Sequence, residues 1–473
     1  MTRSPAHVEL PGERQLTAEL LKLAAPIIAM MISRTAMGFI DFWMVSYLGT
    51  TAQAAISPAA MLIFTVSCLG MGVANAVQTF VAQADGRGQG DLAGAYTWQS
   101  LYVALLCAVA IAPLAATTET WYGHVARLAQ HDAEMARLEI QYTRIALWSV
   151  PPAVLSIGLN SFFMGIQRPR PALLAVIVSL LVNAVGNYVL IFGKLGAPAL
   201  GMRGAAIATV AGWGARVLFL AGAMMLPEFD RRYRTRRIAG WSNPRLAGML
   251  RVGGPTSLHW LIDIGSWLVF LAVIIPPLGV NAVAGSNIGL QLMHLSFMPA
   301  VGIGIALCSQ VGFSIGRRCP ERAVAQTRVA MRLNGAYMGA IGLVFLLCGA
   351  WLTRLFNHDP AVVAAGRLVL IGAGVFQVFD AMAITHVNAL RGAGDTRWPA
   401  VAVLLTCWGI FVGGGALVTR LRPEWGVLGP WATCALYIIV LGVALRWRWR
   451  SGHWRQIKLF SENDEDNLAH QAS

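Results

Sequence analysis

Residues 22–48 have the sequence KLAAPIIAMMISRTAMGFIDFWMVSYL, and between Leu23 and Leu48 the only charged residues are Arg34 and Asp41. A helix needs about 20 mostly apolar residues to cross the hydrocarbon core of a bilayer. The stretch therefore predicts a membrane-spanning helix. The residues before it include acidic side chains and lack the apolar core of a signal peptide, so we expect this first span to be retained.

Apolar runs of similar length recur along all 473 residues, of which 56% are hydrophobic and only 12% are charged. Soluble domains carry about a quarter charged residues, so the bilayer must be the solvent for most of this chain. We predict an all-α membrane protein with about twelve spans. The spans are expected near residues 22–48, 54–83, 92–117, 138–166, 171–193, 201–227, 246–275, 282–315, 325–352, 361–390, 399–419 and 427–448.

Basic residues gather in loops that a twelve-span topology places on one side of the membrane. The loops 228–251 and 316–332 and the segment after the last span are rich in arginine, whereas the alternate loop 276–281 has no basic residue. Because cytoplasmic loops carry the excess of Lys and Arg, both termini are expected in the cytoplasm of a bacterial inner-membrane protein. The net charge of +14 then faces water and anionic lipid rather than nucleic acid.

Landmark residues repeat at a nearly constant offset. Leu48-Gly49 and Leu278-Gly279 are 230 residues apart, as are Gly72 and Gly302. The same offset joins Gly86-Arg87 to Gly316-Arg317 and Pro169 to Pro399, and Pro26 precedes Pro255 by 229 residues. Each repeat holds about six spans, an even number, so the two halves should be parallel and related by an axis along the membrane normal.

The repeat predicts two six-helix lobes around a central cleft. We expect an N-terminal lobe at 1–238, a C-terminal lobe at 239–460 and a disordered acidic tail at 461–473. Two such lobes suit alternating access, in which one lobe rocks against the other and opens a shared site to one side at a time. We expect a monomer.

Three carboxylates lie inside predicted spans, each flanked by apolar residues: Asp41 in the first, Asp263 in the seventh and Asp380 in the tenth. A carboxylate at this depth costs about 2.5–3.5 kcal/mol on insertion scales, so each is a candidate functional residue. A buried Asp can alternate between protonated and cation-bound forms, which is the chemistry of a coupling site. The alternative is a structural carboxyl satisfied by Arg34, Arg144, Arg216 or a neighbouring Asn.

Polar and aromatic side chains near these acids could complete a site. Asn183 and Asn187 lie one helical turn apart in the fifth span, and Thr209 follows in the sixth, so the three could join Asp41 in an oxygen-lined cation site. Hydrogen bonding between helices is the open alternative. The candidates for the substrate cavity are Trp260, Phe376 and Gln291, for which core packing is the alternative.

Several classes of protein are disfavoured because their motifs are missing from the sequence. GxxxxGK[ST] and HExxH are absent, which argues against an ATP-driven pump and a zinc enzyme. The seven cysteines form no CxxC pair and lie mostly in apolar runs, which is typical of packing residues. A membrane-embedded lipid-modifying enzyme would need a polar catalytic loop that the sequence lacks. We expect no cofactor and no metal.

From about residue 15 to residue 450 the sequence resembles the multidrug and toxic compound extrusion (MATE) family, and most closely its NorM-like branch. The stretches NAVGNYVLIFGKLGAPALGMRGAAIAT (183–209) and FQVFDAMAITHVNALRGAGDT (376–396) carry most of the resemblance. Supporting features are Pro26, Asp41 with Leu48-Gly49, Gln83, Gly86, Gly165-Ile166-Gln167, Pro255, Asp263 and AVAGSNIGLQ (282–291).

The resemblance implies antiport of organic cations or amphipathic drugs against H⁺ or Na⁺, with Asp41, Asp263 and Asp380 at the family's acidic positions. It also implies that Asn183, Asn187 and Thr209 belong to the cation region of the N-terminal lobe. Two positions depart from the branch: Asp263 stands where Glu is usual, and Phe376 where some relatives have Tyr. The alternative function is a lipid-linked oligosaccharide flippase of related fold, whose cavity should hold several cationic residues.

Overall fold

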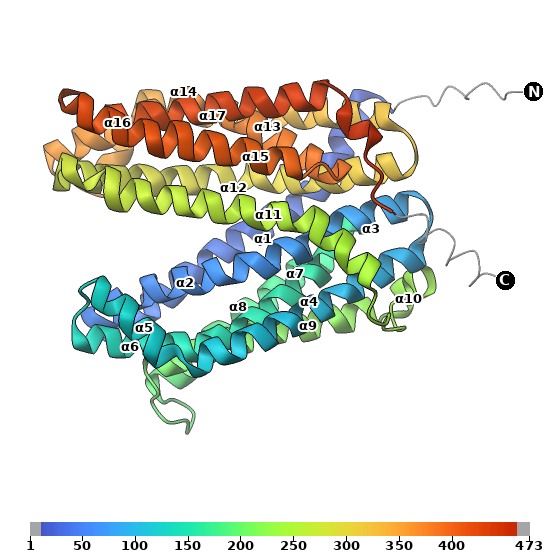
Figure 1. Cartoon of the computed structure of the whole chain (residues 1–473), viewed down its shortest axis with the longest axis horizontal. Coiled ribbons are helices and arrows are strands. Elements are labelled where there is room, and N and C mark those ends of the chain that lie inside the picture. Colours follow the sequence, from blue (N-terminus) through green and yellow to red (C-terminus); the bar gives the residue numbers. More distant parts are fainter. Residues whose placement is uncertain (1–10, 461–473) are drawn as a thin grey trace, which may run out of the picture.

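The computed structural model describes residues 11–460, apart from the side chains of residues 34–36 and 39. Within this range the chain is helical, and twelve of its helical segments are long and apolar enough to cross a membrane. The predicted all-α membrane fold and the predicted number of spans are therefore confirmed. The helices form two bundles that lie side by side (Figure 1).

The first bundle, which we name the N-terminal lobe, contains the helices α1 to α10. Their bounds are α1 Glu13–Ser46, α2 Thr50–Asn75, α3 Val77–Gly86, α4 Gly90–Ala116, α5 Thr118–Leu128, α6 Ala133–Ala146, α7 Val150–Gly165, α8 Arg170–Phe192, α9 Met202–Met224 and α10 Pro227–Tyr233.

The second bundle, the C-terminal lobe, contains α11 to α17. Its helical segments are α11 Asn243–Val269, α12 Val280–Gly316, α13 Pro320–Arg354, α14 Pro360–Ala393, α15 Arg397–Leu404, α16 Gly414–Leu421 and α17 Leu428–Arg450, with π-helical turns at Phe270–Ile274 and Leu405–Gly413. The lobes divide between α10 and α11, and the boundary at residues 238 and 239 stays a prediction.

The structure differs from the expected spans in three local ways. The short helices α5 and α10 lie between spans and were not expected. Several spans begin earlier than their apolar run, as α1 does at Glu13, because a helix can project beyond the bilayer into water. Two spans contain π-helical turns, which place one extra residue in the helical ladder and leave no periodic trace in an apolar sequence.

Helix α10 is held to the N-terminal lobe by a buried carboxylate. Asp85, at the end of α3, accepts hydrogen bonds from Arg232 at 2.7 Å and from the Tyr233 hydroxyl at 2.9 Å. Burial, together with the negative charge of Asp85, raises the pKa of the Tyr233 phenol above its ordinary value. Tyr233 therefore keeps its proton and remains a donor to Asp85.

The 230-residue repeat is visible in backbone conformation. Gly49 precedes α2 with φ 107° and ψ 168°, and Gly279 precedes α12 with φ 99° and ψ 165°. This region is open to glycine and strained for other residues. Glycine therefore occupies both equivalent turns, because each turn requires this positive φ.

The contacts between the lobes are also related by the repeat. A side chain at Gly72 of α2 would clash with Ser257 of α11, and a side chain at Gly302 of α12 would clash with Ile28 of α1. At the centre, Gly86 and Gly316 pack directly against each other, and neither leaves room for a Cβ atom. We call this line of close backbone contacts the interlobe seam. Glycines let the two lobes approach closely, as small residues do at other membrane helix interfaces.

Side-chain hydrogen bonds from α3 reinforce the seam. The Gln78 amide donates to the Ile305 carbonyl at 2.9 Å and to the Ser309 hydroxyl at 2.8 Å, both on α12. Thr79 and Gln83 donate to the last carbonyls of α14, those of Arg391 and Gly392, at 3.0 Å each. These hydrogen bonds join α3 of the N-terminal lobe to the end of α14 in the C-terminal lobe.

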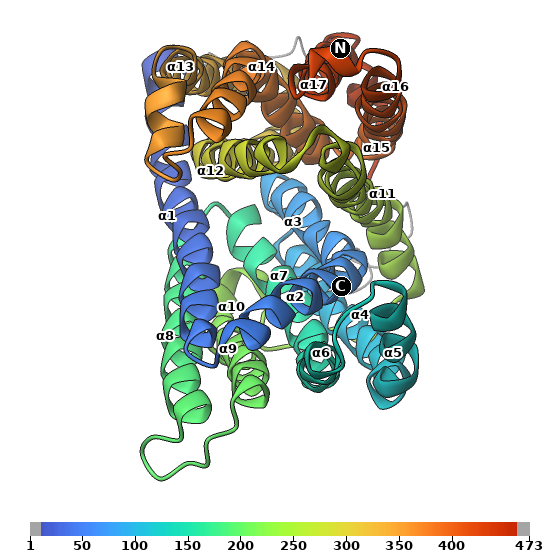
Figure 2. The ribbon, with the colours of Figure 1, turned by 90° about the vertical axis from the view of Figure 1, so that its left-hand side faces the viewer.

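The two lobes meet at one end of the molecule and lie apart at the other (Figure 1). The end where they meet carries α10 and the two ends of the described chain, and we call it the terminal end. The opposite end carries α5, α6 and α16, and we call it the open end. Viewed from the open end, the lobes form two separate groups of helices, with α1 and α11 lying along the boundary between them (Figure 2).

Candidate substrate and cation site

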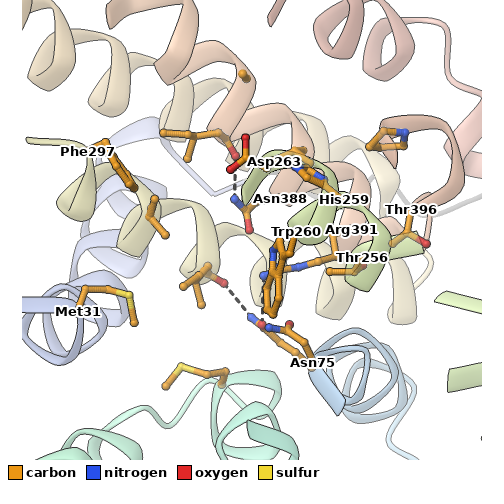
Figure 3. Close-up of a pocket in the computed structure, with 18 of the residues that line it drawn as sticks. Met31, Asn75, Thr256, His259, Trp260, Asp263, Phe297, Asn388, Arg391 and Thr396 are labelled. Carbon is orange, nitrogen blue, oxygen red and sulfur yellow. Dashed lines mark hydrogen bonds between the residues drawn. The ribbon is translucent and has the colours of Figure 1, made fainter. Parts of the chain in front are cut away.

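A cavity of about 450 Å³ lies between the lobes and is lined by both. Asn75 of α2 and Trp260 of α11 project toward each other across it (Figure 3). Apolar side chains such as Met31 and Phe297 form much of the remaining wall. A mostly apolar cavity with a few polar groups is typical of a small-molecule site.

Two of the predicted carboxylates face this cavity. Asp263 comes from the middle of α11 and Asp380 from the middle of α14, and both line the same space. They are close enough to act on each other electrostatically. Among the described side chains, neither carboxylate takes part in an ion pair. A pair of like charges in a poorly solvated wall attracts a cation or a proton.

Cationic side chains occupy other parts of the wall. Arg216 of α9 is buried, and its guanidinium donates to the Asn160 side chain at 3.3 Å. Arg391, in the last turn of α14, donates to Gln78 across the seam at 3.3 Å. Both arginines line the cavity. The cavity thus has acidic groups on the C-terminal lobe and basic groups from both lobes.

The third predicted carboxylate, Asp41, lies in a separate polar cluster within the N-terminal lobe. It is half-buried on α1 and accepts a hydrogen bond from the Asn187 amide of α8 at 2.5 Å. The same amide lies 3.3 Å from the Asn183 side-chain oxygen, and both asparagines are almost fully buried. The structure therefore brings Asp41, Asn183 and Asn187 together.

This cluster leaves oxygen atoms available to a cation. The side-chain oxygen of Asn187 is buried and has no hydrogen-bond donor among the described residues. Thr209 donates its hydroxyl proton to the Ala205 carbonyl at 2.9 Å, so its oxygen can act only as an acceptor in this cluster. Tyr142 of α6 interacts with both Thr209 and Asp41. Carboxylate, amide and hydroxyl oxygens are the ligands of hard cations.

The structure does not bring all the predicted cavity residues together. Trp260 lines the cavity, but Phe376 does not, because it is 97% buried in the packed core of the C-terminal lobe. Gln291 is exposed on α12 and is not part of this wall. Residue type and span assignment could not separate these cases, because the direction of a side chain depends on how its helix is rotated in the bundle.

Other residues of the site were missed by the sequence analysis. Arg391 was not singled out from the sequence, yet it lies within α14 and faces the cavity. Its position in the stretch 376–396, one helical turn after polar His386 and Asn388, was the available indication. The polar lining residues Asn75, Gln78, Asn160 and Asn388 gave no indication of their own.

The arginines proposed as structural partners of the acids have other described contacts. Arg144 donates to Glu119 at 3.0 Å in an exposed ion pair at the open end. Arg216 contacts Asn160 and lies over the ring of Trp213 at 5.4 Å. The side chain of Arg34 is outside the described part. The polar wall is therefore mixed in charge and is not the cationic cluster that a pyrophosphate-binding flippase requires.

The paired lobes, and the cavity between them with Asp263 and Asp380 in its wall, define a polytopic transporter. A sequence profile of the MatE family matches residues 26–189 and 261–412, one segment in each lobe. The chain belongs to the MatE family. This membership places it among secondary transporters and not among enzymes.

Similar proteins cover nearly the whole chain. A probable multidrug resistance protein NorM of Idiomarina loihiensis is 26% identical over 441 residues, which cover 91% of this chain and 93% of that protein. A probable NorM of Rhizobium meliloti is 29% identical over 442 residues, covering 90% and 92%. The crystal structure of the eukaryotic MATE transporter AtDTX14 shares the fold with a TM-score of 0.82 at 20% identity, covering 94% and 98%.

Proposed function

We propose that this chain exports organic cations or amphipathic drugs in exchange for H⁺ or Na⁺, by exposing the interlobe cavity alternately to the two sides of the membrane. The names of its bacterial relatives, multidrug resistance proteins, support the substrate class. The transporter would reside in the bacterial inner membrane. It would work as a monomer, because each lobe finds its partner within the same chain.

One observation carries the proposal: acidic side chains stand in membrane helices of both lobes without an ion-pair partner among the described side chains. Asp263 and Asp380 face the cavity, and Asp41 accepts a hydrogen bond from the neutral, buried amide of Asn187. A lasting structural role would favour a fixed counter-charge, because an uncompensated buried carboxylate is costly. A role in coupling requires the opposite, a group that accepts and releases a cation during each cycle.

The arginine-rich loops would place the terminal end in the cytoplasm. The seam at that end would then be the closed cytoplasmic side, and the conformation would be open to the outside. In the proposed cycle, a cation entering from outside binds the carboxylates and favours release of the drug. The lobes then part at the seam and the cation leaves to the cytoplasm.

Dye efflux from proteoliposomes tests the proposal. A cationic dye is loaded, and a pH gradient or a sodium gradient is imposed separately. We expect one gradient to accelerate dye movement and the other to have little effect, which identifies the coupling ion. Equal dye movement with no gradient and with either gradient would contradict antiport.

The flippase alternative makes a different prediction in the same vesicles. A lipid pyrophosphate would need several cations around its head group, and here Asp263 and Asp380 share the cavity with Arg216 and Arg391. We expect that a lipid pyrophosphate does not stimulate transport. We expect that a second cationic dye competes with the loaded dye. The opposite pattern would favour the flippase.

A further inference from the structure

A tyrosine on α17 lies beside the two carboxylates of the cavity. Tyr437 lines the interlobe cavity together with Asp263 of α11 and Asp380 of α14. Both carboxylates are close enough to act electrostatically on its hydroxyl group. Three membrane helices of the C-terminal lobe therefore bring one phenol and two carboxylates to the same part of the wall.

The ring of Tyr437 is held by aromatic packing. It stacks on Phe411 with 4.8 Å between the ring centroids and 21° between the ring planes, and only 6% of Tyr437 is exposed. Phe411 lies in the π-helical turn Leu405–Gly413 and packs against Phe270 of α11 at 4.5 Å. Turns of this kind are frequent at functional sites. The packed rings therefore set the position of the hydroxyl group, and no polar contact is needed to hold it.

The hydroxyl group of Tyr437 forms no hydrogen bond with another described residue. Buried tyrosine and tryptophan side chains usually have a partner for their polar atom. In the same lobe, the Tyr337 hydroxyl donates to the Ser296 carbonyl at 2.9 Å. The Trp431 indole donates to the Ser286 hydroxyl at 3.0 Å. A phenol in a cavity wall that lacks such a protein partner can act on what enters the cavity.

The charge around this hydroxyl group comes from the two carboxylates. The other titratable groups that act on Tyr437 are the thiols of Cys407, in the π-helical turn, and Cys434, three residues earlier on α17. Both cysteines are fully buried, and thiols in apolar surroundings keep their protons and are inert. Asp263 and Asp380 are therefore the groups through which the phenol can affect the binding of a cation.

We propose that the hydroxyl group of Tyr437 is the third oxygen of a cation site that it forms with Asp263 and Asp380. Before a cation enters, the phenol donates its proton to one of the carboxylates and stabilises the ionised form. When Na⁺ enters, the hydroxyl oxygen becomes a ligand, because hydroxyl and carboxylate oxygens suit hard cations. A proton that binds the same carboxylate competes with the hydrogen bond from the phenol. This inference rests on the cation-coupled exchange of the proposed function and adds a residue to its site.

Displacement of a bound dye by cations tests the role of the hydroxyl group. A monocationic rhodamine dye is bound to the full-length protein in detergent. Its fluorescence anisotropy is followed while NaCl replaces choline chloride at constant ionic strength, and separately while the pH is lowered. The variant is Tyr437→Phe, which keeps the ring on Phe411 and removes only the oxygen atom.

The expected effects on the two cations are opposite in direction. If Na⁺ displaces the dye from the parent protein, Tyr437→Phe should need about five- to tenfold more Na⁺, because the ion has lost a ligand. If protons displace the dye, the variant should release it at a pH about 0.5 to 1 unit higher, because the ionised carboxylate has lost a donor. General damage to the site would weaken the response to either cation.

The matched control is Tyr337→Phe, which removes a hydroxyl group whose partner is a backbone carbonyl and which is not part of this cavity wall. It should leave both displacement curves unchanged. Without a competing cation, both variants should bind the dye within about twofold of the parent affinity, because the carboxylates and not the phenols neutralise the charge of the dye.

The proposal is refuted if Tyr437→Phe releases the dye at the Na⁺ concentration and the pH of the parent protein. A lower midpoint of thermal unfolding with unchanged displacement curves would show that Tyr437 has a structural role only. A loss of dye affinity of tenfold or more without a competing cation would make the phenol a ligand of the drug instead. If neither Na⁺ nor protons displace the dye from the parent protein, the result contradicts the cation coupling of the proposed function itself.

Discussion

At the residue scale, the position of Asp41 is energetically unfavourable for a carboxylate but suited to binding a cation. A carboxylate within a span is unfavourable by about 2.5–3.5 kcal/mol, and the Asn187 amide offsets part of this by donating to it at 2.5 Å. The amide is neutral, and no described side chain forms an ion pair with Asp41. An entering cation can therefore find both the charge of Asp41 and the side-chain oxygen of Asn187, which has no hydrogen-bond donor among the described residues.

Replacing Asp41 with Asn should abolish drug-driven cation exchange in proteoliposomes. The amide has the same shape and still accepts from Asn187, so the free energy of unfolding should change by less than about 1 kcal/mol. Asp359→Asn is the matched control, because Asp359 caps the exposed start of α14 and Asn is an equally good cap. Undiminished exchange by Asp41→Asn would remove this residue from the mechanism.

The carboxylates in the cavity should set the affinity for cationic drugs. Asp263→Asn or Asp380→Asn should each weaken the binding of a monocationic dye about ten- to a hundredfold, since each removes a poorly solvated counter-charge. Asp395 lines the same cavity but is paired with Arg448 at 2.8 Å. Asp395→Asn should therefore change dye affinity much less. Fluorescence anisotropy of the bound dye measures all three, and equal losses would show that net charge alone decides binding.

At the element scale, the seam depends on backbone contact between α3 and α12. Gly86 and Gly316 touch at the pseudo-symmetry axis, and the space that a methyl group would need is taken by backbone atoms of the other lobe. Backbone cannot move aside as a flexible side chain can. The closed arrangement of these two helices is thus available to glycine and to no larger residue.

Gly316→Ala should destabilise the closed seam by about 1–3 kcal/mol, as overpacking does elsewhere. The expected results are a lower midpoint of thermal unfolding and a shift toward the seam-open state, seen by pulsed electron spin resonance as a shorter distance between labels at Leu128→Cys of α5 and Leu421→Cys of α16. Gly254→Ala, in α11, is the control, since a Cβ atom there meets nothing within 4 Å. That variant should be neutral or slightly stabilising. The same response from both variants would show that helix propensity, not contact at the seam, is responsible.

The elements also show what a sequence pattern can reveal. The 230-residue repeat predicted two equivalent halves, and the matching turns at Gly49 and Gly279 agree with it in backbone conformation. The π-helical turns near Phe270 and Cys407 and the short helices α5 and α10 were not foreseen. An apolar run has no periodicity that distinguishes one helical ladder from another, so only the folded chain reveals them.

At the scale of the whole molecule, the two lobes are tied together at one end by polar contacts and close glycines. Transport by alternating access requires these contacts to break. Two ion pairs at the terminal end also cross between the lobes, Glu19 with Arg322 at 2.9 Å and Glu13 with Arg332. Both are at least partly exposed, so each contributes little by itself. They mark positions where the movement can be tested.

Cross-linking Glu19→Cys to Arg322→Cys with a reagent of about 10 Å should stop transport, and reduction should restore it, because the lobes could no longer part at this end. The control joins Glu119→Cys to Arg144→Cys, an ion pair within the N-terminal lobe. That link should leave dye transport unaffected. If the interlobe link is equally harmless, the lobes do not separate at the seam during transport.

The sequence by itself determined the membrane fold, the number of spans, the repeat and the depth of Asp41, Asp263 and Asp380. These properties depend on segment length and on spacing along the chain. A bilayer of fixed thickness requires an apolar segment of sufficient length to cross it as a helix. Only the tertiary structure decided that Asp263 and Asp380 share a cavity with Arg391 while Phe376 and Gln291 do not, and that Tyr437 lies beside both carboxylates. Such relations depend on how each helix is rotated and packed against residues hundreds of positions away, and no local pattern records that choice.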